Sequence, residues 1–185
     1  MSADRYVRRM KLTPPDPPLG DGVVTLRPPD EHDLPAIERG VRDPDVVRGF
    51  GRLSASAGDL LELNRQRWRE GEAATFAICD RTGACLGHVF VNLGGAGRGS
   101  VGYWLLPEAR GKGLATRAVR LLSHWAFADL GLARLQLLTE PSNEDSHRVA
   151  ERCGFQREGV LRSYTQIDGR RVDYVVFSLL PGDVG

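Results

Sequence analysis

One stretch of the chain, residues 100–131, changes its hydrophobic period from that of a strand to that of a helix. Residues 100–106 have the composition of a strand, and Pro107 ends it because proline cannot donate to a strand ladder. After a loop, apolar residues recur at the spacing of an amphipathic helix: Leu114, Ala118, Leu121, Leu122 and Trp125. Gly131 closes that helix. Such a unit requires a sheet with a helix packed on its face.

The segments on either side extend this pattern into an ordered set. The expected strands are 23–27, 75–79, 85–93, 100–106, 135–139, 155–164 and 172–180, and the expected helices are 33–41, 56–71, 114–131 and 142–154. Asp33, Ser56 and Ser142 are the expected N-cap residues. This order predicts an α/β fold, a mixed sheet with helices on its faces.

We expect the first 21 residues to form a flexible, proline-rich arm outside this domain. Prolines at positions 14, 15, 17 and 18 forbid a regular strand ladder. An arm that binds RNA or a partner is an alternative that its basic start leaves open. Residues 22–185 then form the single domain expected of a chain of 185 residues.

Composition excludes several classes of function. The formal charge is +1, so no global field draws the chain to nucleic acid or to an anionic membrane. No apolar run approaches the ~20 residues needed to span a bilayer. Four scattered histidines and three cysteines without zinc spacing predict no metal site. The cysteines, Cys79, Cys85 and Cys153, are expected to be reduced thiols of a cytoplasmic protein.

Two glycine patterns that match nucleotide-binding motifs fail on context. Gly97, Gly99 and Gly102 have the spacing of a dinucleotide-binding motif, but they open a strand rather than a helix. The Gly111-Lys112 pair lacks the first glycine of a P-loop, since Leu106 stands in its place.

The loop at residues 107–116 does have the features of an anion site. It joins a strand to a helix, its glycines leave backbone N–H groups uncovered, and the helix dipole adds positive potential there. Five cations surround it, Arg98, Arg110, Lys112, Arg117 and Arg120, and Glu108 opposes them. A phosphate-binding loop and a plain strand–helix turn both fit these residues.

The same loop resembles a family signature. Arg110-x-x-Gly113-x-Ala115 is similar to the acyl-CoA signature, Q/R-x-x-G-x-G/A, of the GNAT acetyltransferase superfamily. Its surroundings agree with this family: Gly102-Tyr103-Trp104-Leu105 enters the loop, Asn143-x-x-Ser146 precedes Cys153-Gly154-Phe155, and Leu161-Arg162 leads to Asp168-Gly169-Arg170-Arg171-Val172-Asp173. This ordered set, over residues 22–181, most resembles the RimJ/RimL-type branch, whose founding members acetylate N-termini of ribosomal proteins. The resemblance implies a twisted sheet of about seven strands, splayed in the middle, with about four helices.

The resemblance also implies acetyl-CoA, or another acyl-CoA, as the cosubstrate. The loop would hold the pyrophosphate through Arg110, Gly111, Lys112, Gly113, Ala115 and Thr116. Backbone groups of Leu105 and Leu106 would pair with the pantetheine amides at the splay, and Asn143 would hydrogen-bond the CoA arm where the sheet opens.

Acyl transfer to an amine needs a donor for the developing oxyanion and a proton for the departing thiolate. A strand amide near Leu105 is the expected oxyanion donor. Ser146 matches the serine that RimL-type members place three residues after the asparagine, so we expect it to be the general acid, with Tyr164 in reserve. Ala150 stands where many GNAT enzymes carry a tyrosine.

The general base stays open. Residues 102–104 lack the glutamate that many family members carry before the acyl-CoA loop. A water-relayed proton or an already neutral amine would serve instead. His88 and His147 could assist, or both could be structural.

The acceptor is expected to be a small-molecule amine or a protein N-terminus, bound by the helices within 33–70 and the turn at 167–170. The expected pocket residues are Phe50, Trp68, His88 and Tyr103. The favoured function is N-acyl transfer by direct attack in a ternary complex. The alternatives are a non-catalytic acyl-CoA sensor and an acyltransferase that uses a longer acyl-CoA or a carrier-protein thioester. A homodimer is one of the oligomeric states left open.

Overall fold

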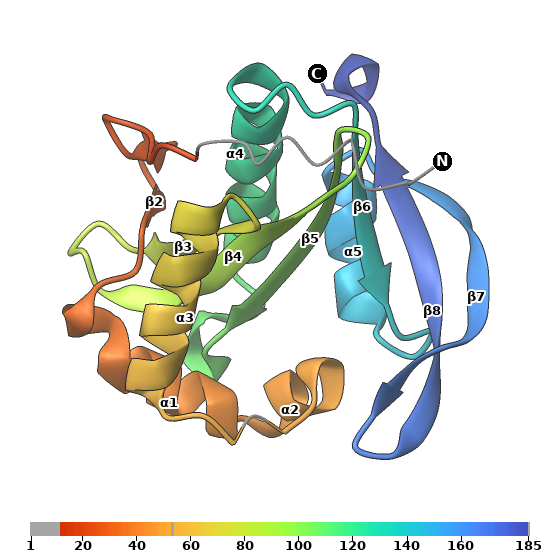
Figure 1. The fold of residues 1–185 in the computed structure, drawn as a ribbon, viewed down its shortest axis with the longest axis horizontal. Coiled ribbons are helices and arrows are strands. Elements are labelled where there is room, and N and C mark those ends of the chain that lie inside the picture. The colour runs from red at the N-terminus through yellow and green to blue at the C-terminus, as the bar shows by residue number, and fades with distance from the viewer. Residues whose placement is uncertain (1–11, 53, 185) are drawn as a thin grey trace.

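The computed structural model describes residues 12–52 and 54–184, and within them one eight-stranded sheet forms the centre of the molecule (Figure 1). The strand order is β1-β2-β3-β4-β5-β6-β8-β7. The strands are β1 (Leu19–Gly20), β2 (Thr25–Arg27), β3 (Ala73–Cys79), β4 (Cys85–Gly94), β5 (Arg98–Leu105), β6 (Arg134–Thr139), β7 (Gln156–Ile167) and β8 (Arg170–Leu179). β5 and β6 pair in parallel and the other neighbours are antiparallel, so the predicted mixed sheet is confirmed.

Five α-helices flank this sheet in the described part of the chain: α1 (Leu34–Arg42), α2 (Pro44–Phe50), α3 (Ala57–Glu70), α4 (Leu114–Ala128) and α5 (Glu144–Arg152). The first three lie on one face, and α4 and α5 lie on the other (Figure 1). β1 and α2, which are short, are not among the elements expected from the sequence. Of the helices described, none is long and apolar enough to cross a membrane.

Of the three expected N-caps, Ser56 is confirmed, Asp33 is confirmed in position only, and Ser142 is wrong. Ser56 does cap α3, in a capping box with Asp59. Asp33 is the N-cap residue of α1, but its side chain makes no cap hydrogen bond. Its buried carboxylate accepts two hydrogen bonds of 2.8 Å from the Arg27 guanidinium. At α5 the cap is Asn143 rather than Ser142, because the Asn143 Oδ1 accepts the Ser146 N–H at 3.1 Å.

Part of the expected flexible arm, residues 1–21, belongs to the folded domain. Residues 1–11 lie outside the described residues, but Leu12 is buried in the core and β1 pairs with β2. Asp21 also forms an ion pair with Arg117 on α4, in which the Asp21 Oδ2 lies 2.7 Å from the Arg117 Nη1. The four prolines precede β1 and are therefore compatible with a strand of only two residues.

The core between the sheet and α4 confirms the helical period that the sequence predicts. Ala118, Val119, Leu122 and Trp125 are buried against side chains of β3, β4 and β5. This packing fixes the N-terminus of α4 beside the end of β5, where the glycine loop enters the helix.

The sheet splays between its two parallel strands. β5 pairs with β6 only from Arg98 to Val101. Beyond this point β5 stays with β4, up to the Gly87–Leu105 pair, while β6 stays with β8, up to the Thr139–Val175 pair. The expected splay is therefore confirmed, and it places an open wedge between residues 102–105 and residues 138–139.

Gly87 allows β4 to approach the last residues of β5. Its φ is +155°, and a Cβ there would lie 2.1 Å from the Trp104 carbonyl oxygen and 2.8 Å from the Leu105 Cα. Gly87→Ala should therefore lower the free energy of unfolding by about 2–3 kcal/mol, a typical cost of overpacking. Urea unfolding measures this change.

The matched control is Gly83→Ala in the preceding turn. Gly83 also has a positive φ, +87°, but its Cβ would meet no atom within 4 Å. This variant should lose only the roughly 1–2 kcal/mol of left-handed strain. Equal losses in the two variants would show that close approach of β4 and β5 does not matter at Gly87.

Candidate active site

The backbone of Leu105 lines the wedge. Amide directions alternate along a strand, and the Leu106 N–H donates to the Leu86 carbonyl oxygen at 2.8 Å, toward β4. The Leu105 N–H therefore points the other way, into the opening between β5 and β6. This is the direction that an oxyanion donor at the wedge requires.

Leu106 does not share this role. Its N–H is used by Leu86, and its carbonyl oxygen accepts the Ala109 N–H at 2.9 Å, in the short turn after β5. The Leu106 N–H is therefore not available to pantetheine, and only the second lone pair of its carbonyl oxygen could accept a pantetheine amide.

The loop into α4 contains consecutive backbone N–H groups that donate no hydrogen bond within the described residues, and these are called the uncommitted amides below. Gly111 and Gly113 have φ values of +71° and +74°, and a Cβ on either would meet no atom within 4 Å. Among the described residues, no backbone hydrogen bond is donated by the amides of residues 111–116. Gly113 is the N-cap of α4 and supplies no side-chain cap. Backbone donors and the helix dipole therefore converge on one open surface.

The Arg110 guanidinium is directed away from this loop. Its Nη2 lies 2.5 Å from Asp43 and its Nη1 lies 2.7 Å from Asp45, at the start of α2. Its Nε donates to the Leu105 carbonyl oxygen at 3.1 Å. Burial opposes ionisation of Asp43, but hydrogen bonds from Arg110 and from backbone amides outweigh it and lower the Asp43 pKa. Arg110 thus joins α2 to the end of β5, a contact that its place in the signature loop does not predict.

Ser146 and Tyr103 meet on the α5 side of the wedge. The Tyr103 hydroxyl donates to the Ser146 Oγ at 3.1 Å. Burial raises the pKa of Tyr103 to about 12, although its hydrogen bond to Ser146 lowers it. Tyr103 was expected in the acceptor pocket and instead supports the candidate general acid.

Asn143 lies at the same end of α5, where β6 leads into the helix. Its Oδ1 is bonded to the Ser146 N–H, and no hydrogen bond from its Nδ2 group is found within the described residues. The Nδ2 group is therefore the part of Asn143 that can donate to a bound molecule.

Tyr164 lies on the β7–β8 hairpin and is half exposed. Its ring centroid is 5.9 Å from that of Tyr174, and no hydrogen bond joins it to Ser146 or Tyr103 within the described residues. His147 is held by the Glu140 carbonyl oxygen at 3.2 Å and by the ring of Phe177. The structure therefore brings neither residue to the Ser146 hydroxyl through a direct hydrogen bond.

Two expected pocket residues are in the core. Trp68 stacks on Trp125 at 6.1 Å and meets Phe76 edge-on. His88 is buried against Trp104, and burial lowers its pKa to about 4, so it is neutral at pH 7. Both residues were expected to line the acceptor pocket. They are buried because α3 and β4 turn these positions toward apolar side chains, which a single sequence does not reveal.

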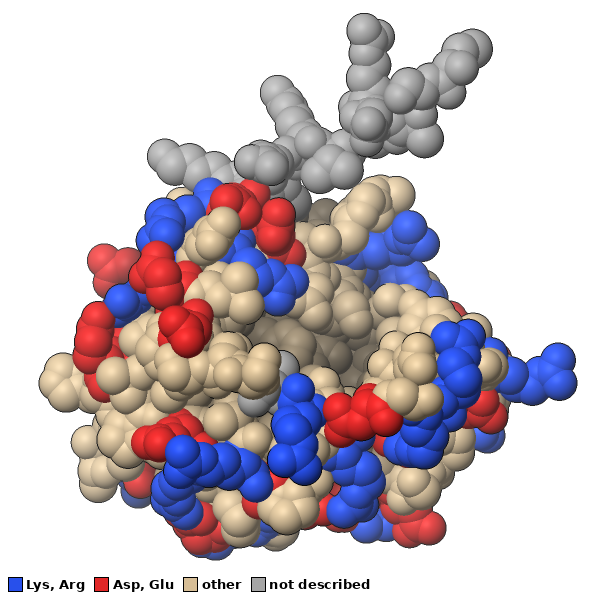
Figure 2. Space-filling view, turned by 60° about the horizontal axis from the view of Figure 1, so that its bottom comes forward, with Lys and Arg blue, Asp and Glu red and all other residues tan. Residues whose placement is uncertain are grey.

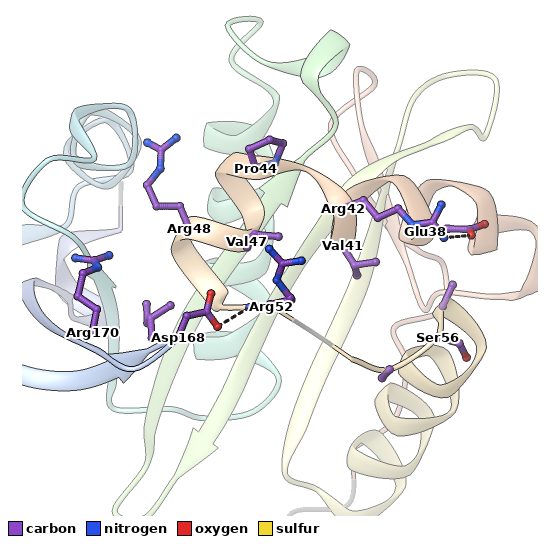
Figure 3. Close-up of a pocket in the computed structure, with 13 residues that line it drawn as sticks. Glu38, Val41, Arg42, Pro44, Val47, Arg48, Arg52, Ser56, Asp168 and Arg170 are labelled. Carbon is purple, nitrogen blue, oxygen red and sulfur yellow. Dashed lines mark hydrogen bonds and ion pairs between the residues drawn. The ribbon is translucent and has the colours of Figure 1, made fainter.

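A pocket of about 940 Å³ lies between α1, α2, the start of α3 and the β7–β8 turn (Figure 3). Figure 2 shows that this end of the molecule is hollowed, with charged side chains of both signs around the opening. Residues of α1, α2 and α3 and of the 167–170 turn line this pocket, and these are the segments expected to bind the acceptor. Phe50 does not line it; its ring lies 5.8 Å from that of Phe90. Arg48, on α2, and Arg52, just after it, are lining residues that the sequence does not predict, because α2 is not among the expected helices.

Comparison with known proteins agrees with this geometry. The family model for the acetyltransferase (GNAT) domain matches residues 24–156. An uncharacterized N-acetyltransferase, p20 of Bacillus licheniformis, is 31% identical over 164 residues, which cover 85% of this chain and 92% of that protein. The spermidine N(1)-acetyltransferase of Escherichia coli K12 is 28% identical over 149 residues and 80% of each chain.

The fold also has solved neighbours. RimJ of Mycobacterium smegmatis, solved in complex with CoA-disulfide, superposes with a TM-score of 0.77 at 24% identity, covering 95% of this chain and 90% of that one. Family model, relative and fold together show that this chain is an enzyme of the GNAT acetyltransferase family.

Proposed function

We propose that this enzyme transfers an acetyl group from acetyl-CoA to a primary amine by direct attack in a ternary complex. The observation that carries the proposal is the wedge between β5 and β6. The Leu105 N–H points into it, the uncommitted amides of residues 111–116 lie at the end of the same strand, and the Ser146 hydroxyl lies on its α5 side. A neighbour of this fold has been solved with CoA-disulfide, which supports the same class of donor here.

The donor would be held mainly by backbone. The amides of residues 111–116 would bind its pyrophosphate, and Lys112, which is exposed, would add a cation. The pantetheine arm would lie in the wedge and extend the β5 ladder through Leu105, while the Asn143 Nδ2 group would donate to the arm. Thr116 would contribute its N–H only, because its Oγ1 is buried.

In the reaction, the neutral amine attacks the thioester carbonyl carbon and the C–N bond forms. The Leu105 N–H stabilises the oxyanion that develops. The C–S bond then breaks, and the thiolate takes the proton of the Ser146 hydroxyl. Because Tyr103 donates to the Ser146 Oγ, it turns the serine proton outward and stabilises the charge that grows on that oxygen. The ammonium proton leaves to water, since no side chain is assigned as the base, and water returns a proton to the Ser146 oxygen, so that the enzyme is restored and the products are the acetylated amine and free CoA thiol.

An assay of CoA release across a panel of primary amines tests this proposal. Free thiol should appear in step with an acetylated amine identified by mass spectrometry. Tight binding of acetyl-CoA with no release for any amine would instead indicate a sensor. A preference for a longer acyl-CoA, or for a carrier-protein thioester, would keep the reaction and change its donor.

The three free thiols of the described chain support the cytoplasm as its compartment.

The two cations of the signature loop should have separable effects. Lys112→Gln removes a charge from the proposed phosphate site and should weaken acetyl-CoA binding about tenfold. Arg110→Gln should change the Kd for acetyl-CoA by less than about twofold but raise the KM for the amine, since Arg110 holds α2. Calorimetry and initial rates measure both. A larger loss of acetyl-CoA affinity in Arg110→Gln than in Lys112→Gln would restore the pyrophosphate role of Arg110.

The rate should depend on pH through the amine alone. kcat/KM for the amine should rise with pH as the ammonium loses its proton. No descending limb should appear below about pH 10, because the raised pKa of Tyr103 keeps its hydroxyl protonated over that range. A pH–rate profile measures this. A descending limb below pH 10 that disappears in Tyr103→Phe would mean that Tyr103 titrates in the working range.

A further inference from the structure

The pocket beside α2 is lined by more cations than anions. Four arginines face it, Arg42, Arg48, Arg52 and Arg170, against two carboxylates, Glu38 and Asp168. Its volume of about 940 Å³ is that of a small-molecule site. Figure 3 places Arg52 in the middle of the α2 wall, with Arg48 and Arg170 on one side and Arg42 on the other.

The carboxylates that pair with these arginines leave the cationic groups accessible. Glu38 is matched by Arg42 at 2.8 Å. Asp45 serves both Arg48 and Arg110, at 2.5 and 2.7 Å. Glu140, the partner of Arg170 at 3.3 Å, has a side chain only 12% exposed, whereas that of Arg170 is 58% exposed. A molecule in the pocket would therefore reach the Arg170 guanidinium far more readily than the carboxylate of Glu140, whereas Glu38 and Asp45 are themselves exposed beside Arg42 and Arg48.

Arg52 is the strongest candidate for a ligand contact. It is exposed, it lines the pocket, and among the described residues its side chain forms no ion pair. The backbone N–H of Arg52 donates to the Asp168 Oδ1 at 3.3 Å, and this bond joins the end of α2 to the β7–β8 turn. An exposed guanidinium without a carboxylate partner is suited to bind a carboxylate or a phosphate in two parallel hydrogen bonds.

We propose that the acceptor is an amine that also carries an anionic group, a carboxylate or a phosphate, and that Arg52 binds this group. The inference rests on the proposed function and deepens it, because the amine would then be presented from this pocket to the wedge. Arg110 connects the two places, since it bonds Asp43 and Asp45 at the start of α2 and the Leu105 carbonyl oxygen at the end of β5. A polycation would meet Glu38, already paired, and Asp168 as its acidic contacts.

The test compares matched amines in the CoA-release assay. One arm pairs β-alanine with β-alaninamide, and a second pairs O-phosphoethanolamine with ethanolamine, so that carboxylate and phosphate are told apart. Spermidine and kanamycin are the cationic arm. We expect kcat/KM for at least one anionic member to exceed that of its neutral partner by about tenfold or more, the effect of one charge-assisted hydrogen bond. Neither cationic amine should exceed that member.

Variants assign the preference to Arg52. Arg52→Gln should remove most of the preference for the anionic member by raising its KM, and Arg52→Lys should restore part of it. The matched control is Arg81→Gln, which removes the same charge at the β3–β4 turn, away from the pocket. It should keep the preference of the wild type. Melting temperatures show whether each variant is folded.

The outcomes separate the inference from the proposed function. Turnover that is fastest with spermidine or kanamycin, or equal within each matched pair, overturns the inference and leaves acetyl transfer intact. A preference that survives Arg52→Gln overturns the assignment to Arg52. Acetyl-CoA binding with no CoA release from any amine of the panel overturns the proposed function and this inference with it.

Discussion

Gly113→Asp should abolish the rise in melting temperature that acetyl-CoA gives the wild-type protein. Gly113 is the N-cap of α4, and its N–H belongs to the group of uncommitted amides that we assign to the pyrophosphate. An aspartate there adds a negative charge where two phosphates must lie and a side chain where backbone must approach them. The free protein should still fold, because a Cβ at this position meets no atom within 4 Å.

Strain at the positive φ of Gly113 needs its own control. Gly113→Asn places a side chain of the same shape at φ +74°, a conformation that asparagine tolerates better than most residues. It adds no charge. We expect Gly113→Asn to retain a weakened shift and Gly113→Asp to show none, as measured by thermal unfolding with and without acetyl-CoA. Binding by the folded aspartate variant at the affinity of the wild type would place the donor elsewhere.

Ser146→Ala should lower kcat by roughly 10²-fold, the usual scale for one acid–base group. The Kd for acetyl-CoA should change little, because the hydroxyl matters mainly as charge grows on sulfur. The cap of α5 should persist, since Asn143 accepts the backbone N–H of residue 146 rather than its side chain. Single-turnover and steady-state rates together measure the effect on chemistry.

Two hydroxyl variants complete the comparison. Tyr103→Phe should lower kcat less than Ser146→Ala, because it removes the hydrogen bond to the Ser146 Oγ but leaves the proton donor in place. Tyr164→Phe should be near wild type, as Tyr164 is half exposed on the β7–β8 hairpin. If Ser146→Ala kept its activity while Tyr164→Phe lost it, with chemistry rate-limiting, the role of general acid would pass to Tyr164. Full activity in all three variants would leave solvent as the proton source.

Local patterns in the sequence predicted the parts of the fold that local chemistry decides. The helical period of α4 and the capping box of α3 are set by residues close together in the chain, and both are confirmed. The glycine pattern at Gly97, Gly99 and Gly102 is not a dinucleotide site, since Gly97 directly precedes β5 and the other two lie within that strand. The wedge was expected only through the family resemblance.

Contacts between residues far apart in the chain determine the features of the site that the sequence does not predict. Arg110 meets Asp43 and Asp45, more than sixty residues away, so its local place in the signature loop said nothing of its partner. Asp33 does stand at the N-cap of α1, but its carboxylate pairs with Arg27, from a strand earlier in the chain, instead of capping the helix. Trp68 and His88 had the chemistry of pocket residues, and only the packing of α3 and β4 shows that they are buried.

The position of the acetyl group in a crystal structure of the acetyl-CoA complex, determined without an amine, tests the central claim most directly. We predict that the pantetheine arm lies in the wedge between β5 and β6. The thioester oxygen should accept the Leu105 N–H within hydrogen-bond distance, and its sulfur should face the Ser146 hydroxyl. A thioester bound away from the wedge, or an acetyl group turned from both Leu105 and Ser146, would contradict the account.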